Sequence, residues 1–412
     1  MTETVLSAAR RIDFMRFVKS NLRDYALLLS LLAIMVFFQF STNGTLFMPV
    51  NMTNIVLQNS YIVIMALGML LVIVAGHIDL SVGSLSGFIG GVAALMMTGT
   101  MPFAQGETFG FKFDPYSTAL ICVALGAGIG AIQGYFIAYH KIPAFIVTLA
   151  GMLVFRGMEL QVLGGASVGP FPKTFQLLSS GYVPDLFSID VFGGSFNLLA
   201  LLIGTAVTLA MIYFNTTERR AQLAHGLAEE PLLIFMCRNA LLAVAFIGFA
   251  FLMAQYKGLP NVLIVMFALI ALFVFITKRT TFGRRIYAMG GNEKATRLSG
   301  INTERLTFQI FVIMGALSAL AGLIFAARLN VATPKAGQGF ELDVIAACFI
   351  GGAAVTGGVG KVTGAVIGAF MMGVMNNGMS ILGIDIGWQF GIKGVVLLLA
   401  VFLDTYYKNK AA

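Results

Sequence analysis

Charged residues are scarce in this sequence: they make up 11% of its 412 residues, whereas 58% are hydrophobic and the mean hydropathy is +0.90. Water-soluble domains contain about 25% charged residues, so this composition excludes a soluble globular protein. The short segments of alternating polarity that a membrane β-barrel requires are absent as well. The chain is therefore predicted to be an all-α, polytopic integral membrane protein with about 10–12 transmembrane helices, forming one transmembrane domain over residues 1–412.

Residues that hold metals or nucleotides are also few. The cysteines all lie inside apolar runs and the histidines are scattered, which argues against a disulfide framework or a zinc site: Cys122, Cys237, Cys348, His77, His140 and His225. The nearest approach to a nucleotide-binding loop is Gly360-Lys361-Val362, but position 355 is valine instead of glycine and Val362 lacks the hydroxyl that binds magnesium. We therefore expect no catalytic, metal or cofactor site, and the chain is not expected to be an enzyme.

Long apolar runs account for most of the chain. Twelve runs fit membrane spans: residues 24–41, 54–75, 81–99, 117–139, 143–163, 196–214, 232–254, 260–277, 306–327, 342–357, 362–382 and 389–407. Five basic residues precede the first run, which superficially resembles a signal peptide. Because it lacks a small-residue cleavage site, we interpret it as a retained span.

The distribution of Lys and Arg predicts the orientation of these spans. The net charge of +8 does not indicate a nucleic-acid partner, because the basic residues stand in short loops beside the runs. With twelve spans, both termini lie on one side of the membrane. The opposite side has five basic residues (Lys112, Lys173, Lys257, Arg328 and Lys335) and three lie inside runs (Arg156, Arg238 and Lys393), which leaves 18 of the 26 on the side of the termini. Both termini are therefore predicted to be cytoplasmic.

Glycines recur at a spacing of four in three of the runs. The strings are Gly83, Gly87, Gly91; Gly126, Gly130, Gly134; and Gly360, Gly364, Gly368. Each string places a smooth stripe on one helix face, which favours close packing of helix backbones.

Ionisable and polar residues inside the apolar runs are candidates for function, since each ionisable one is costly to insert. Arg156 and Glu159 stand three residues apart on one helix face and can neutralise each other, or they can take part in a path. Asp79 and Ser81 lie at a tight turn between two spans, where they can bond to free helix amides, form a gate or make a subunit contact. Three further polar residues can line a path or bond between helices: Asn376, Asn377 and Gln389.

The basic loop from 278 to 305 is the most informative segment. Its second part is predicted to form one short helix, capped by Asn292, favoured by Glu293 at its positive end and terminated by Gly300. Ala295 and Leu298 give it a small apolar face that suits a groove on a partner. Gly290 and Gly291 before it are predicted to act as a flexible hinge.

Four ordered motifs spanning residues 76 to 370 carry a resemblance to a family. They are the stretch 76–83, the stretch 142–149 with Arg156-Gly157, the loop 281–301, and residues 341–347 leading to Gly351-Gly352 and Gly357-Gly358-Val359-Gly360. Together they closely resemble bacterial ABC-type monosaccharide importer permeases of the ribose, galactose, arabinose and xylose group, and most of all the xylose or multiple-sugar branch. The resemblance implies a homodimeric permease in the bacterial inner membrane, surrounded by lipid, with a cytoplasmic ATP-binding subunit and a periplasmic sugar-binding protein as partners.

The resemblance also assigns a role to the basic loop. In the family this loop contacts the ATPase, which points to Arg284, Arg285, Gly290, Gly291, Asn292, Glu293, Arg297 and Gly300 as ATPase-coupling residues here. The absence of a nucleotide-binding loop agrees with ATP hydrolysis on another chain. The rival interpretation is a self-sufficient ion-coupled secondary transporter that uses Asp79, Arg156 and Glu159 as ion or proton groups. A channel is disfavoured because no ring of charge is visible.

Overall fold

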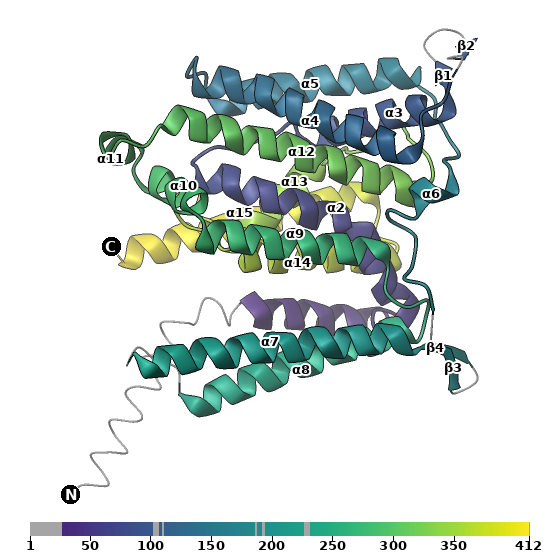
Figure 1. Ribbon diagram of the computed structural model, residues 1–412, viewed down its shortest axis with the longest axis vertical. Helices are drawn as coiled ribbons and strands as arrows, with labels where there is room; N and C mark the ends of the chain where they lie inside the picture. Colours follow the sequence, from purple (N-terminus) through teal and green to yellow (C-terminus); the bar gives the residue numbers. More distant parts are fainter. Residues whose placement is uncertain are drawn as a thin grey trace, which may run out of the picture.

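The computed structural model describes residues 27–101, 107–108, 111–185, 188–191, 194–225 and 231–411. Helices dominate this part of the chain (Figure 1). A first helix spans Leu27–Ser41. The others are α2 (Pro49–Val74), α3 (Val82–Thr98), α4 (Pro115–Ala138), α5 (Ala144–Leu163), α6 (Lys173–Gln176), α7 (Leu198–Ala224), α8 (Leu232–Ala254), α9 (Asn261–Arg279), α10 (Thr281–Gly291), α11 (Glu293–Leu298), α12 (Thr303–Leu329), α13 (Phe340–Ile350), α14 (Val362–Ile381) and α15 (Ile386–Ala411).

Two small antiparallel hairpins interrupt the helical pattern. The strands β1 (Thr100–Met101) and β2 (Glu107–Thr108) pair in one hairpin, and β3 (Ser188–Val191) and β4 (Gly194–Asn197) pair in the other. The first hairpin lies in the loop 100–116 and the second begins in the loop 164–195, on the side opposite the predicted cytoplasmic termini. They are short and lie between helices, so they do not change the all-α fold class.

Eight of the described helices are long and apolar enough to cross a membrane, and three shorter ones are also apolar: Leu27–Ser41, Val82–Thr98 and Ile386–Phe402. The prediction of an all-α, polytopic membrane protein is confirmed. The run 342–357 behaves differently, because its helix α13 has only 11 residues. Gly352, Gly357 and Gly358 all adopt positive φ angles just beyond it, so the chain turns back where the apolar composition continues.

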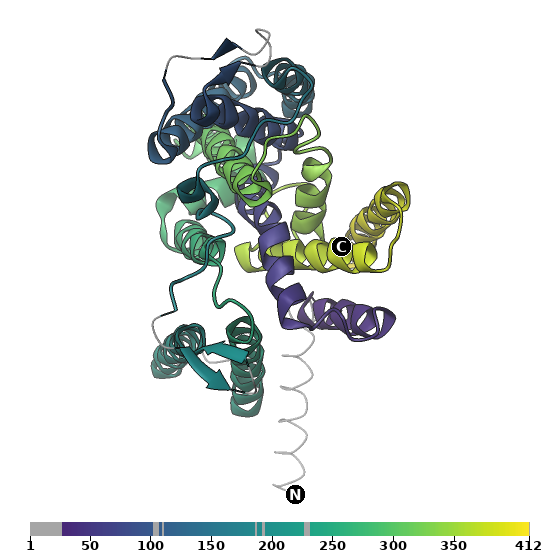
Figure 2. The same ribbon diagram turned by 90° about the vertical axis from the view of Figure 1, so that its right-hand side faces the viewer.

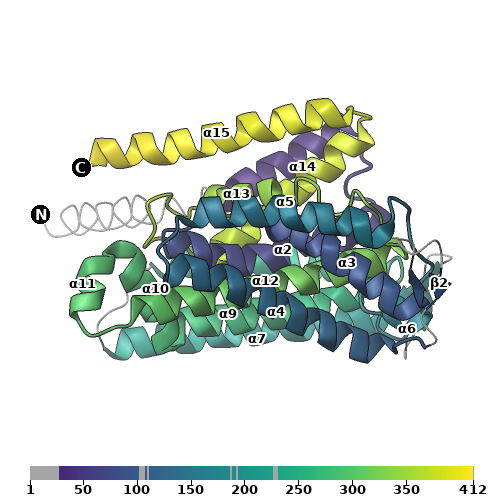
Figure 3. The same cartoon turned by 90° about the horizontal axis from the view of Figure 1, so that it is seen from above.

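The elements gather at two opposite ends of the helix bundle. Figures 1 and 3 show α10 and α11 at one end, and β1–β2 with α6 at the other. The C-terminal end of α15 lies at the same end as α11 (Figure 1). This arrangement separates the basic loop 278–305 from the long loops 100–116 and 164–195. The five basic residues of the N-terminal tail lie outside the described residues.

Helix α2 is the centre of the bundle. Of its most apolar stretch, 94% of the residues are buried, and it packs against α12, α13 and α14. The predicted glycine stripes allow close packing around this centre. A Cβ on Gly130 would overlap the carbonyl oxygen of Phe311 in α12, and one on Gly364 would overlap that of Gly351 beside α13. The packing role of the stripes of α4 and α14 is therefore confirmed.

Helices α7 and α8 form a hairpin at the edge of the bundle. They pack mainly on each other, and only 11% of the most apolar stretch of each is buried. Figures 1 and 2 show them side by side and away from α3, α4 and α5. Most of their apolar surface thus faces outward, as expected for helices surrounded by lipid.

Candidate functional site

The basic loop 278–305 folds as two helices. Thr280 caps α10 by accepting a hydrogen bond from the Gly283 amide at 3.2 Å, and Asn292 caps α11 by accepting one from the Ala295 amide at 2.9 Å. Gly300 follows α11 with a φ angle of +80°. The predicted cap at Asn292 and the predicted stop at Gly300 are confirmed. Helix α10 was not expected from the sequence.

Helix α10 packs into the bundle with one face. Its Ile286 and Met289 side chains are buried, and the Tyr287 hydroxyl donates a hydrogen bond of 2.7 Å to the carbonyl oxygen of Gly360. The basic residues Arg284 and Arg285 lie on its exposed side. Helix α10 is therefore fixed to the transmembrane helices rather than suspended in solvent.

The end of α10 meets two other segments at their backbones, in what we call the glycine junction: Val74, Gly76, Gly290, Gly357 and Gly358. The Gly358 amide donates a hydrogen bond of 2.8 Å to the carbonyl oxygen of Val74. A Cβ on Gly290 would overlap that same oxygen and would lie 2.6 Å from the Gly358 nitrogen. Three of the four sequence motifs, far apart in the chain, thus converge at one point where only glycine fits.

The two glycines predicted to form a hinge have different surroundings. Both are part of the regular helix α10, and neither has a positive φ angle. The structure therefore shows no hinge at either glycine. Gly290 permits close approach, whereas a Cβ on Gly291 would meet nothing within 4 Å. The hinge interpretation was wrong because neither glycine stands between the two helices; Asn292 does.

Helix α11 presents most of its surface to solvent. Leu298 is 89% exposed, and Ala295, Glu293 and Asn292 are exposed as well, so the predicted apolar face is available. Arg297, 66% exposed, lies 3.5 Å from Glu304 at the start of α12. Two surface hollows of about 480 and 540 Å³ flank α10, one lined by Arg285 and Arg305 among others and one by Lys278, Arg284 and Lys361 among others.

The turn between α2 and α3 is held by a buried polar network. The Asp79 carboxylate accepts hydrogen bonds from the Ser81 amide at 2.8 Å and from the Ser81 hydroxyl at 2.7 Å. Gln133 of α4 donates to the Ser81 hydroxyl at 3.0 Å. Burial raises the pKa of Asp79 to about 6, although the bonds from Ser81 act in the opposite direction. These contacts favour the local-bonding interpretation and connect the turn to α4.

Arg156 and Glu159 form the predicted pair on α5. Their closest atoms are 2.7 Å apart, and Arg156 also donates to the carbonyl oxygen of Ala336 at 2.7 Å. Glu159 is fully buried, with one carboxylate oxygen seated against Gly87, while Glu341 of α13 lies against Gly83. The glycine stripe of α3 therefore makes room for two carboxylates. Arg156 and Glu159 are therefore in direct contact, as their spacing of three residues predicts.

The polar residues of α14 bond between helices. Asn376 donates to the Asp343 carboxylate at 3.1 Å, and that carboxylate also pairs with Lys393 of α15 at 2.9 Å. Asn377 accepts a hydrogen bond from Asn51 of α2 at 3.0 Å. The Gln389 side chain of α15 donates to the nearby carbonyl oxygen of Ile384. Asp343 is 3% exposed, because α13 begins inside the bundle.

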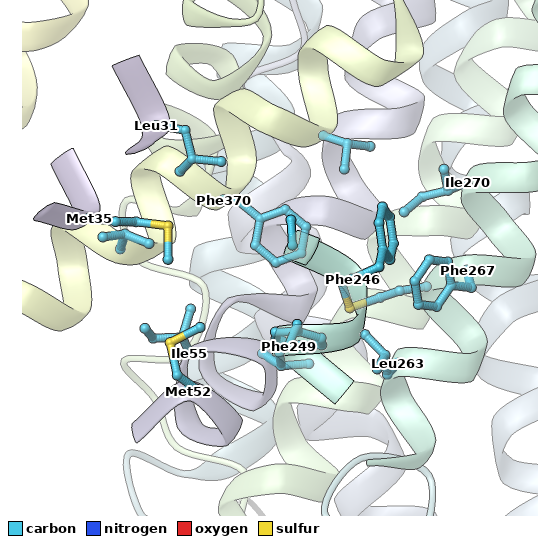
Figure 4. A pocket seen from close by; sticks show the side chains of 15 residues that line it. Leu31, Met35, Met52, Ile55, Phe246, Phe249, Leu263, Phe267, Ile270 and Phe370 are labelled. Atoms are coloured by element: carbon cyan, nitrogen blue, oxygen red, sulfur yellow. The ribbon is translucent and has the colours of Figure 1, made fainter. Parts of the chain in front are cut away.

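An apolar cavity of about 340 Å³ lies between the first helix, α2, α8, α9 and α14 (Figure 4). Its wall includes Met52, Phe246, Phe249, Leu263 and Phe370, and every side chain that lines it is apolar. A hydroxylated solute would find no hydrogen-bond partner there. This cavity is therefore a poor candidate for a polar path.

Comparisons with known proteins identify related chains. Residues 51–401 match the family described as "Branched-chain amino acid transport system / permease component". The chain is 39% identical over 390 residues to the xylose transport system permease protein XylH of Haemophilus influenzae, covering 95% of this chain and 98% of that protein. The corresponding protein of Escherichia coli K12 is 38% identical over 394 residues, covering 95% and 94%. The ribose import permease protein RbsC of Escherichia coli K12 is 33% identical over 388 residues, covering 94% and 95%. No solved structure matches the chain.

Proposed function

Because the chain belongs to this family of transport-system permease components, we propose that it is the membrane-spanning permease subunit of an ATP-driven importer. Its cargo is a monosaccharide, xylose or a related sugar, delivered by an external binding protein. The observation that carries the choice of sugar is the similarity to the xylose permeases over 95% of the chain. The whole chain, 1–412, acts as one permease domain.

Helices α10 and α11 are the proposed contact with a cytoplasmic ATP-binding subunit. Helix α11 offers an exposed apolar face at Ala295 and Leu298, and α10 joins it to the glycine junction. A movement imposed on α11 would therefore reach α2 and the loop after α13 through backbone contacts. The coupling residues are Arg284, Arg285, Gly290, Gly291, Asn292, Glu293, Arg297 and Gly300.

The remaining partners follow from the same proposal. A second copy of this chain completes a homodimer, a periplasmic binding protein docks on the side of the long loops, and lipid surrounds α7 and α8. The chain itself holds no cofactor and carries out no catalysis. The path between the helices has only to bind the sugar weakly, because the binding protein supplies the affinity and the sugar must leave again. ATP binding shifts the populations of inward-facing and outward-facing states.

The ion-coupled alternative has less support. Its proposed ion groups already have partners in the structure: Arg156 pairs with Glu159, and Asp79 accepts two hydrogen bonds from Ser81. A gate or path role for Asp79, Ser81, Arg156, Glu159, Asn376, Asn377 and Gln389 stays part of the proposal.

Transport by reconstituted protein tests the function. We expect D-xylose to accumulate in proteoliposomes only when the permease, its ATPase and the binding protein are all present, and vanadate to abolish the accumulation. Uptake by the permease alone, driven by an ion gradient and insensitive to vanadate, would establish the alternative instead.

Cysteine labelling tests the proposed orientation, with both termini in the cytoplasm of a bacterial inner membrane. In a background carrying Cys237→Ser, whose other cysteines are buried, an impermeant maleimide added to intact cells should label Lys112→Cys and Lys173→Cys. Arg220→Cys and Lys294→Cys should react only after the membrane is opened. Labelling of Lys294→Cys from outside would contradict the proposed ATPase contact.

A further inference from the structure

A cluster of aromatic and polar side chains gathers around the start of α13, midway along the central helix α2. We call it the α13 cluster, and it comprises Tyr61, Phe325, Arg328, Phe340, Asp343 and Asn376. The members come from α2, α12, α13 and α14, which are distant in sequence. Resting on the proposed function above, we propose that the α13 cluster is the site where the permease itself holds a monosaccharide during translocation.

Three rings of the cluster stack on one another. Tyr61 and Phe340 lie face to face with ring centroids 3.8 Å apart and planes inclined by 22°. Phe325 meets both edge-on, with centroids 5.6 Å from Tyr61 and 5.0 Å from Phe340. A sugar ring has an apolar C–H face that can replace one ring in such a stack. The rings therefore close the site in this conformation and supply a flat surface when they separate.

Polar groups stand beside the rings. The Arg328 guanidinium carbon lies 5.3 Å from the Phe325 ring centroid, and Asp343 stands three residues after Phe340 on α13. Asn376 donates a hydrogen bond of 3.1 Å to Asp343. Sugar hydroxyls need both donors and acceptors, and this set provides both.

Among the described residues, three buried atoms of the cluster have no hydrogen-bond partner: Arg328 Nε, Asn376 Oδ1 and Asp343 Oδ1. Asp343 Oδ1 lies 2.9 Å from the Lys393 ammonium, which leaves Arg328 Nε and Asn376 Oδ1 with unused capacity. Buried polar atoms normally have a hydrogen-bond partner, so each such atom calls for an explanation. A hydroxylated guest between the rings would supply an acceptor for the first and a donor for the second.

The backbone around the cluster is that of a broken transmembrane helix. An α13 of 11 residues is about 16 Å long, roughly half the hydrocarbon thickness. Its N-terminal residue, Phe340, follows Gly339 in a left-handed conformation, and no side chain caps this end. Transporters commonly build solute sites near the membrane midplane from such interrupted helices. The apolar cavity beside α8 has neither a broken helix nor a polar group.

Saturation-transfer NMR tests the site without requiring transport. With purified permease and millimolar D-xylose, we expect signal transfer to the ring C–H protons of the sugar. Phe340→Leu should reduce the transfer about tenfold. Phe88→Leu is the matched control, because Phe88 is also buried and stacks on Phe155 outside the cluster. Tyr61→Phe, which keeps the stack, should reduce the transfer less than Phe340→Leu and guards against a folding defect.

Two results would overturn the inference: no transfer to D-xylose with a wild-type permease that is active in uptake, or equal transfer with Phe340→Leu and Phe88→Leu. In the complete transporter, Phe340→Leu should also lower the amount of D-xylose imported per ATP hydrolysed, while Phe88→Leu should not. Failure of the proposed function would appear differently, as a wild-type complex that shows no ATP-driven uptake.

Discussion

Helices α10 and α11 are neighbours in the chain, yet they differ in what covers them. Helix α10 buries Ile286 and Met289 in the bundle and ends at the glycine junction, whereas α11 leaves Leu298 89% exposed. An isolated helix of six residues is not stable in water; α11 packs on α10 and α12 with Thr296 buried, and its apolar face at Ala295 and Leu298 is left for a partner. This difference shows that the segment from α10 to α11 has two distinct interfaces: that of α10 is completed within the permease, and that of α11 is open to a partner.

The largest effect is expected at the interface that is completed within the permease, where α10 meets the glycine junction. Gly290→Val should abolish sugar-stimulated ATP hydrolysis, because its side chain would overlap the Val74 carbonyl oxygen and displace α10 from the junction. Gly248→Val in α8, outside the proposed contact, is the matched control and should retain most of the stimulation, since a Cβ there meets nothing within 4 Å. ATP hydrolysis by the reconstituted complex measures both. Equal stimulation in the two variants would remove the junction from the coupling route.

The second largest effect is expected at the exposed face of α11, which is open to a partner. Leu298→Asp places a carboxylate on the exposed apolar face of α11, and removing such an anchor from an interface typically costs about 2 kcal/mol, or about thirtyfold in affinity. We expect binding of the ATPase to weaken by that amount while the permease keeps its thermal stability. Titration of the detergent-solubilised permease with the ATPase gives the affinity. Ser299→Asp, one residue beyond α11, is the control and should bind nearly normally.

A smaller effect is expected for Tyr287→Phe, which should change the stability of the permease but not its affinity for the ATPase. Tyr287→Phe removes the hydrogen bond to the Gly360 carbonyl oxygen, which should lower the free energy of unfolding by about 1 kcal/mol. Thermal denaturation should detect this loss, but the affinity for the ATPase should stay within about twofold of wild type. A large loss of affinity without loss of stability would show that Tyr287 faces the partner.

The smallest effect is expected for Arg297→Gln. This side chain is 66% exposed and lies 3.5 Å from Glu304, and exposed ion pairs contribute about 0.2–1 kcal/mol. Sugar-stimulated ATP hydrolysis should therefore fall by no more than about fivefold. A loss as large as that of Leu298→Asp would mean that Arg297 forms a buried pair with the partner.

The sequence predicted those features that depend on local chemistry. The cap at Asn292 and the stop at Gly300 were recognisable because their geometry is decided by one or two residues. Helix α10 was not, since its glycines are poor helix formers and packing on α9, α12 and α2 stabilises it instead. The role of Val74 at the junction could not be predicted from the sequence, because it contributes a backbone carbonyl oxygen, which every residue has.

The length of α13 and the burial of Asp343 also escaped prediction. Apolar composition continues past Ile350, so hydropathy does not report the turn that three glycines with positive φ produce. Asp343 stands near the end of an apolar run, and its burial follows only from where α13 begins. The rings of the α13 cluster are three aromatic residues in a chain with 36 phenylalanines and 11 tyrosines, so composition could not single them out.

The glycine contacts have a consequence for heritable variation in this protein. Any change in the first or second base of a glycine codon adds a side chain or stops translation, and at Gly130, Gly290 or Gly364 the new atom would overlap a carbonyl oxygen of a neighbouring segment. No single-base change at these codons that alters the residue is conservative. Helices α7 and α8 are less restricted, because most of their side chains face outward, although a Cβ on Gly204 would overlap the Cβ of Ala250. We therefore expect natural variants to accumulate in that hairpin, while the glycine contacts of α2, α4, α12 and α14 stay almost unchanged.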